Sequence, residues 1–334
     1  MYYHSNKDYY AQSSFEANKQ FDQIETTIAH LFRFPHPALN GRNYGAAFCY
    51  EVIRRGILSN RYERIIEVGG GTGHFAQGFL QELRKSDSQM EYSIIDISPA
   101  LQQAQQDLLK DKARFILGDA QALPFGAKEV NGLIICNEVV ADLDAVEMTH
   151  HEWERSQDPI VEQLRAAFPI EDEKILLNIG AIKFINEAGR VLADGGCAVI
   201  TEHGLEGNGR IAITGRLDDA SRSHTEYSIN FNHLRFVAES IGFQAEIIQL
   251  IDFLCFDQDM EVANLNDAQG LNGADQNWSI SAIPATEIAA IYGCTIKDLR
   301  QVAGLRLPKI GGEGFPDDNT LPFSLSFKAL ILKK

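Results

Sequence analysis

The sequence contains no run of about 18 apolar residues, the length that a membrane-spanning helix requires. Residues 1–8 carry tyrosines and charged side chains, so they lack the apolar centre of a secretory signal. The five cysteines are scattered and form no Cys-x-x-Cys pair, which argues against a disulfide framework or a zinc site. We therefore expect a cytoplasmic protein with no membrane segment.

Positively charged residues are also scarce. The sequence contains 30 Lys and Arg residues but 46 Asp and Glu residues, which gives a formal net charge of −16. A surface of this sign repels phosphate backbones, so nucleic acid is not an expected partner. The charge tolerates a cationic peptide without identifying one.

The segment Arg64–Phe75 joins a short β-branched strand to a glycine-rich turn and then to a helical pattern. Gly69, Gly71 and Gly73 allow positive φ angles and a close approach to a ligand, and the helix that follows offers free N–H groups. Such a turn suits either a nucleoside cofactor or a dinucleotide. The dinucleotide interpretation takes Gly71, Gly73 and Ala76 as a Gly-x-Gly-x-x-Ala motif with an acid about 20 residues later.

Strands and helices alternate through most of the chain, which predicts an α/β fold with a doubly wound, mainly parallel, seven-stranded Rossmann-like sheet. The expected strands are 64–68, 92–96, 114–117, 132–136, 197–202, 245–254 and 323–332. The expected helices are 15–32, 44–55, 74–84, 100–110, 178–192, 230–241 and 284–305, the last interrupted at Gly293.

Acidic residues stand at the carboxyl ends of the first four strands, at positions 67, 96, 119 and 138. Ligands of such sheets bind beyond these strand ends. Asp96 is placed to accept both ribose hydroxyls, and Asp119 to accept the exocyclic amine of an adenine. Glu67 is placed near an ammonium or sulfonium group.

These acids favour S-adenosylmethionine (SAM) over NAD, whose pyrophosphate would be repelled by Glu67 and Asp119. Each acid also has a simpler interpretation, since Glu67 or Asp96 can cap a helix and Asp119 can start a turn. Ile97 and Ala120, which directly follow two of the acids, complete the expected cofactor contacts together with Asn137 and the three turn glycines.

Further along the chain, several short motifs resemble the class I SAM-dependent methyltransferases and, within them, the MidA-like family. The matching pieces are Glu67–Gly73, Asp96–Leu101, Asn137-Glu138, Asn230–Leu234 with Gly242, and Phe327–Leu330. The resemblance implies a SAM-dependent methyltransferase; known members of this family include arginine methyltransferases of mitochondrial complex I assembly. The turn differs from the family's Gly-Pro-Gly-Arg-Gly, with Thr72 in place of the arginine, and Val139 to Asp142 replace the family's Phe-Phe-Asp-Ala.

The expected methyl acceptor is a nitrogen or oxygen of a peptide, a protein side chain or a specialised metabolite. Glu138 and Asp142 are candidates to orient a nitrogen acceptor, and His203, just after the fifth expected strand, is a candidate proton acceptor for an oxygen. Glu138 could instead cap a helix. Two other functions stay open: a non-catalytic SAM-binding or assembly protein, and an NAD-type oxidoreductase.

We predict the SAM-binding core at 61–256 and 323–334, behind an N-terminal helical cap at 1–60. Insertions at 142–176 and 257–322 are expected to form a substrate cap that shapes the acceptor pocket. The insertion contains His150-His151-Glu152, whose spacing does not match a His-Glu-x-x-His metal motif, so no metal site is expected.

Overall fold

The centre of the molecule is one mixed β-sheet, in which the strands follow the order β12-β15-β8-β5-β2-β3-β4, with short β11 beside β8. The computed structural model describes residues 2–11, 27–86, 89–170, 172–206, 213–219, 222–264, 282–302, 305–312 and 327–334. The strands of the sheet are β2 (Arg64–Val68), β3 (Glu91–Asp96), β4 (Arg114–Leu117), β5 (Gly132–Asn137), β8 (Cys197–Leu205), β11 (Ile229–Asn230), β12 (Gln244–Gln249) and β15 (Phe327–Lys333).

The sheet is parallel from β4 to β8, and β15 runs antiparallel to both of its neighbours, β8 and β12. The chain reverses its direction of winding at β2, between β3 on one side and β5 on the other. In a doubly wound sheet this reversal opens a crevice at the carboxyl ends of the strands. The predicted α/β fold with seven main strands is confirmed.

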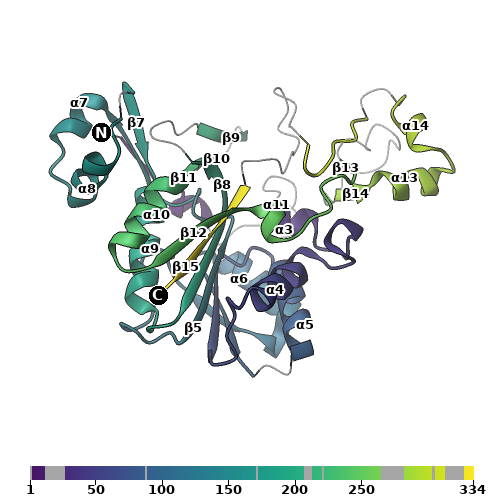
Figure 1. The fold of residues 1–334 in the computed structure, drawn as a ribbon, viewed down its shortest axis with the longest axis horizontal. Helices are drawn as coiled ribbons and strands as arrows, with labels where there is room; N and C mark the ends of the chain where they lie inside the picture. The colour runs from purple at the N-terminus through teal and green to yellow at the C-terminus, as the bar shows by residue number, and fades with distance from the viewer. Residues whose placement is uncertain are drawn as a thin grey trace.

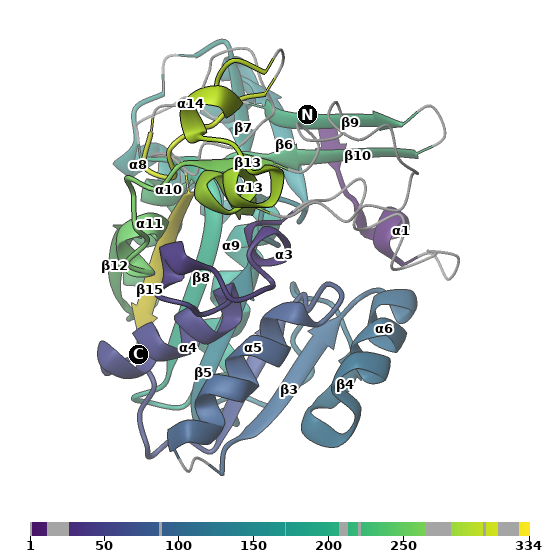
Figure 2. The same ribbon diagram turned by 90° about the vertical axis from the view of Figure 1, so that its right-hand side faces the viewer.

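Successive side chains of each parallel strand point to opposite faces of the sheet, and both faces are apolar. Helices therefore cover both faces. On one face lie α4 (Tyr44–Arg54), α5 (His74–Leu83) and α6 (Pro99–Leu109), with Phe48 and Phe79 fully buried between helices and sheet. On the other lie α9 (Ile179–Val191) and α10 (Phe231–Ser240), around Phe184 and Phe231. Figure 2 shows α4 and α5 side by side over the sheet.

Local sequence signals explain most of these bounds. Ser98 caps the N-terminus of α6 by accepting a hydrogen bond from the backbone N–H of Leu101, and Pro99 occupies the first turn. Asn43 and Asn230 cap α4 and α10 in the same way. The expected strand 245–254 is partly wrong: β12 ends at Gln249, and the apolar residues after it form the short helix α11 (Leu250–Phe253).

The N-terminal residues join a second, three-stranded sheet formed by β1 (Tyr2–His4), β6 (Ala145–Thr149) and β7 (Lys174–Leu177). After β1 the chain forms α1 (Lys7–Tyr10), and after residues 12–26, which lie outside the described part, it forms α3 (Ile28–Leu31). Most of the helix expected at 15–32 therefore lies outside the described residues. Along the chain, α7 (His150–Arg155) and α8 (Pro159–Ala167) follow β6 and precede β7.

Two smaller units extend from the main sheet. One is the hairpin β9 (Ile213–Asp219) and β10 (Arg222–Tyr227). The other comprises β13 (Val262–Asn264), β14 (Ala282–Pro284), α13 (Ala285–Tyr292) and α14 (Ile296–Leu299), which project to one side in Figure 1 around a small apolar core of their own. Gly293 ends α13 in the left-handed conformation, at the interruption expected from the sequence. Within the described residues, none of the helices has the length and apolar character needed to cross a bilayer.

Candidate active site

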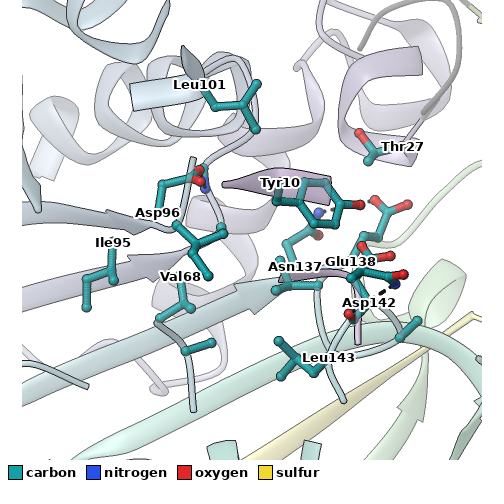
Figure 3. A pocket seen from close by; sticks show the side chains of 18 of the residues that line it. Tyr10, Thr27, Val68, Ile95, Asp96, Leu101, Asn137, Glu138, Asp142 and Leu143 are labelled. Atoms are coloured by element: carbon teal, nitrogen blue, oxygen red, sulfur yellow. Dashed lines mark hydrogen bonds between the residues drawn. The ribbon is translucent and has the colours of Figure 1, made fainter. Parts of the chain in front are cut away.

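A cavity of about 280 Å³ opens at the carboxyl ends of the parallel strands, at the point where the sheet reverses its winding. Its walls come from the carboxyl ends of β2, β3 and β5, from the loops after β2, β3, β4 and β5, from Glu202 and His203 within β8, and from α1 and α3 of the N-terminal region. Figure 3 shows Asp96 toward one end of this cavity and Glu138 with Asp142 toward the other. The structure thus brings predicted cofactor and acceptor residues into a single cavity.

Asp96 ends β3 and is 5% exposed. Its carboxylate accepts hydrogen bonds from the backbone N–H groups of Gly70 (3.2 Å) and Ser98 (2.9 Å), and from the side-chain amide of Gln105 (2.8 Å). Burial raises its pKa to about 6, although these donors oppose the shift. The N-cap of α6 is Ser98, so Asp96 does not cap this helix; its carboxylate fixes the loop between β3 and α6. Asp96 and Ile97 both line the cavity.

The glycine turn lies directly beneath the cavity, and Gly69, Gly70 and Gly71 are among its walls. Gly69 has φ 73°, and a Cβ atom there would approach the Val139 side chain to 2.3 Å, so only glycine fits. Gly73, with φ 89°, stands at the N-cap of α5 without a side-chain cap and does not itself line the cavity. The N-cap residue therefore offers no side-chain acceptor to the first N–H groups of α5, and the first residue of this helix, His74, lines the cavity.

Asp119 and Ala120 line the cavity beyond β4, as expected. One Asp119 oxygen accepts the backbone N–H of Gln121 (2.8 Å), which is the predicted turn-forming role. The other lies 2.7 Å from the Lys7 ammonium of α1. Asp119 is therefore both a turn residue and the anchor for a segment more than 100 residues away in the chain.

Glu67 is placed differently from the other acids. It is 1% exposed and is absent from the cavity walls, because its side chain points to the face of β2 that packs beneath α4 and α5. Its carboxylate accepts a hydrogen bond from the Tyr92 hydroxyl (2.7 Å). Burial and the nearby Asp96 raise its pKa to about 8. A direct contact between Glu67 and a cofactor remains a prediction.

Asn137 ends β5, and Glu138 directly follows it; both line the cavity. The Asn137 carbonyl oxygen accepts hydrogen bonds from Tyr44 (2.8 Å) and Thr201 (2.7 Å), and its amide donates to Glu138 (3.1 Å). Glu138 adopts φ 51°, an uncommon conformation for a residue other than glycine. Its carboxylate accepts the backbone N–H of Ile28 at 3.0 Å, so it caps α3. Burial raises its pKa to about 7.

Asp142 and His203 both line the same cavity. The backbone carbonyl of Asp142 accepts a hydrogen bond from the Asn6 side chain (3.2 Å), which attaches the start of α1 to the loop after β5. His203 packs edge-on against Phe327, with ring centroids 5.5 Å apart, and burial lowers its pKa. A neutral imidazole in this position can accept a proton.

The structure adds cavity residues that the sequence reasoning did not select. Glu202, 4% exposed, accepts the backbone N–H groups of Ala141 (3.1 Å) and His203 (2.9 Å). Its position immediately before His203, at the end of an expected strand, was a usable signal. His30 of α3 and His74 of α5 lie with ring centroids 5.9 Å apart, and no sequence spacing joins them.

Within the described residues, no group of three or more His, Cys, Asp and Glu side chains is placed to hold a metal ion. In the insertion, Glu152 forms a capping box with Thr149 at the start of α7.

Comparison with known proteins identifies a protein family that this sequence matches. Residues 56–174 match the model of a family described as putative S-adenosyl-L-methionine-dependent methyltransferases. Over this range the chain matches a family of SAM-dependent methyltransferases. The matched range contains the glycine turn, Asp96, Asp119 and Glu138, and it confirms the resemblance inferred from the motifs. No curated protein matches the sequence.

Two solved structures from Burkholderia thailandensis share the fold of this methyltransferase. One is described as an uncharacterised superfamily protein; it is 14% identical, with a TM-score of 0.53 over 99% of this chain and 87% of that one. The other is a likely methyl transferase bound to S-adenosyl-homocysteine; it is 14% identical, with a TM-score of 0.51 over 99% and 88%. At this identity the likeness concerns the fold alone.

The cofactor of this methyltransferase is SAM, and the residues of the cavity fit that molecule. The buried Asp96 carboxylate lines one end of the cavity, and among the described residues the walls contain no arginine and no lysine other than Lys7. A pyrophosphate would lack basic partners there. The NAD-type interpretation is therefore not supported by either the site or the family.

Proposed function

We propose that the protein transfers a methyl group from SAM to a nitrogen atom of a peptide, protein side chain or small metabolite. The observation that carries this proposal is the cluster of carboxylates at the acceptor end, Glu138, Asp142 and Glu202, which line one cavity. An amine or guanidine that is cationic in solution would be attracted to this end of the cavity. An oxygen acceptor gains less from these carboxylates, although His203 could serve either acceptor.

At the cofactor end, we propose that Asp96 accepts the two ribose hydroxyls and Asp119 the adenine amine. The glycine turn and the first turn of α5 then lie beside the amino-acid portion. SAM supplies an activated methyl group, so the protein's task is to align the acceptor, exclude water and remove a proton.

The acceptor nitrogen must lose a proton to expose its lone pair. His203 suits this step, because burial keeps its imidazole neutral. Glu138 and Asp142 would hold the acceptor through its remaining N–H groups. Tyr10 of α1 and Thr27 before α3 line the same cavity, so the N-terminal region contributes to closing it.

One observation favours a second candidate, a non-catalytic SAM-binding protein of the same fold. The Glu138 carboxylate already accepts backbone N–H groups of α3, as a purely structural residue would. In that case the cavity would bind SAM without transferring its methyl group.

The deciding experiment incubates the protein with SAM carrying a labelled methyl group and with sets of amine, guanidine and hydroxyl acceptors, including peptides. Label on an amine or guanidine supports the proposal, and label on hydroxyl acceptors alone overturns the choice of nitrogen. If SAM binds by calorimetry but no acceptor is labelled above a His203→Ala, Glu138→Gln double variant, the binding-only function is favoured.

A further inference from the structure

Gln105, on the second turn of α6, is a buried polar residue that joins the end of β3 to the glycine turn. It is 0% exposed and lies outside the cavity walls. Its side-chain amide donates to the Asp96 carboxylate at 2.8 Å and to the backbone carbonyl of Gly71 at 2.9 Å. One NH₂ group thus connects the end of β3 to the glycine turn after β2.

The orientation of this amide is determined by its partners. Both neighbours are acceptors, a carboxylate and a carbonyl, so the nitrogen rather than the oxygen must face them. The Gln105 oxygen has no hydrogen-bond partner among the described residues, so the donor half alone fixes the side chain. The turn also packs closely on it, since a Cβ atom added at Gly70 would lie 2.9 Å from the amide nitrogen.

We propose that Gln105 is a positioning residue for SAM, which holds the Asp96 carboxylate ionised and correctly oriented and locks it to the glycine turn. The inference rests on the proposed role of Asp96 as the acceptor of the ribose hydroxyls. Other residue types fit this position less well. Asparagine is too short to bridge both acceptors, glutamate would place a second anion against Asp96, and methionine fills the space without a donor.

The role has a signature in the pH dependence of SAM binding. Burial raises the pKa of Asp96 to about 6, and the hydrogen bond from Gln105 opposes that shift. Protonated Asp96 is a poorer acceptor for the ribose, so SAM affinity should fall as the pH decreases through about 6. Removing the donor should move this midpoint to higher pH.

The titration of the other ionisable groups near Asp96 can be distinguished from the titration of Asp96. Glu67 on β2 faces it from the neighbouring strand, and burial raises the Glu67 pKa to about 8, above the Asp96 transition. Tyr92 donates to Glu67, and its own pKa lies well above the usual value for tyrosine. Asp119 lies beyond the next strand, on the wall of the same cavity.

The experiment measures the SAM dissociation constant by calorimetry from pH 5 to pH 8.5 for the wild-type protein and for Gln105→Met. We expect the midpoint of the variant to rise by roughly one pH unit, since a hydrogen bond to a charged group has about that effect. Gln103→Met is the matched control: the same change on the same helix, at an exposed residue whose amide donates to Asp107. It should leave the midpoint unchanged.

Gln105→Glu retains the size of the side chain and provides a second variant if Gln105→Met folds poorly. Its carboxylate should raise the midpoint through repulsion of Asp96. An unchanged midpoint in the Gln105 variants, or an equal loss of affinity at every pH, would overturn the inference by reducing Gln105 to a packing residue. Asp96→Asn tests the proposed role of Asp96 separately from that of Gln105. If this variant binds SAM as tightly as wild type, the proposal that Asp96 accepts the ribose hydroxyls is wrong.

Discussion

Asp96 and Glu138 show how a buried carboxylate can combine structural and functional roles. Asp96 accepts two backbone N–H groups and the Gln105 amide, and Glu138 accepts the N-terminus of α3. For Glu138, the alternatives left open by the sequence, capping or ligand binding, therefore do not exclude each other. A carboxylate oxygen has more than one lone pair, so a carboxylate fixed by the backbone can still accept a ligand hydroxyl.

The first prediction concerns Asp96. Asp96→Ala removes the proposed acceptor of the ribose hydroxyls, so SAM binding should weaken by more than tenfold, which corresponds to about 1.4 kcal/mol. The measurement is calorimetric titration with SAM at pH 8, where Asp96 is ionised. Asp107→Ala, an exposed aspartate further along α6, should retain wild-type affinity. Equal affinities for the two variants would remove Asp96 from the site.

The lesson at the scale of elements is that the sequence predicts β-strands and helices well where the signal is local. β2 runs from Arg64 to Val68 as expected, because a β-branched run stops at a glycine turn. The end of β12 was missed because Leu250 to Leu254 continue the apolar pattern while the backbone turns into α11. An apolar run alone does not distinguish a strand from a short buried helix.

Contacts over long sequence separations were not accessible from the sequence. The Lys7–Asp119 ion pair and the capping of α3 by Glu138 each join residues more than 100 positions apart. No spacing rule encodes them, since they depend on how the N-terminal region crosses the carboxyl end of the sheet. The acids at the strand ends were identifiable because parallel strands place their carboxyl ends together.

The capping of α3 gives the second prediction. Glu138→Ala leaves the N–H groups of Ile28 and Ala29 without their carboxylate, so the free energy of unfolding should fall by about 1–2 kcal/mol even without SAM. Glu138→Gln, which retains an acceptor oxygen, should lose less. Denaturant unfolding of both variants provides the measurement. Full stability of Glu138→Ala together with lost methyl transfer would assign Glu138 to catalysis alone.

The packing of α4 on α5 gives the third prediction. A Cβ atom at Gly45 of α4 would lie 2.0 Å from the Phe75 backbone carbonyl, which cannot move without displacing α5. Gly45→Ala should therefore reduce the free energy of unfolding by about 3 kcal/mol or more through overpacking. Gly189→Ala on α9 is the matched control, since its nearest contact is the tip of the Ile241 side chain at 2.8 Å. It should have a much smaller effect, and equal losses would contradict the packing argument.

At the scale of the whole molecule, three buried carboxyl groups in or next to the cavity have raised pKa values. These are about 8 for Glu67, 7 for Glu138 and 6 for Asp96, and burial is the main cause of each. Each group holds its proton in the folded protein at pH values where the unfolded chain has released it. Their contribution to stability is therefore complete at low pH and is lost as the pH rises through the folded pKa values.

Buried histidines act in the opposite direction but in another pH range. Burial lowers the pKa of His30 to about 3 and that of His36 and His233 to about 4. They reduce stability only below the ordinary histidine pKa near 6.5, where the unfolded chain binds protons that the folded protein does not. Above about pH 7.5 these histidines are almost entirely neutral in both states, so between pH 7.5 and 8.5 the carboxyl groups decide the slope.

The fourth prediction follows for the protein without SAM. Its free energy of unfolding should fall by about 1 kcal/mol between pH 7.5 and 8.5, mostly because Glu67 holds its proton in the folded state but not in the unfolded chain. Glu67→Gln can still accept the Tyr92 hydroxyl but does not titrate, so it should flatten this slope and be more stable than wild type at pH 8.5. Denaturant unfolding at several pH values tests this, with Glu246→Gln on the exposed side of β12 as the control. A wild-type slope in Glu67→Gln would show that the acid beneath the glycine turn is not the group that limits stability at alkaline pH.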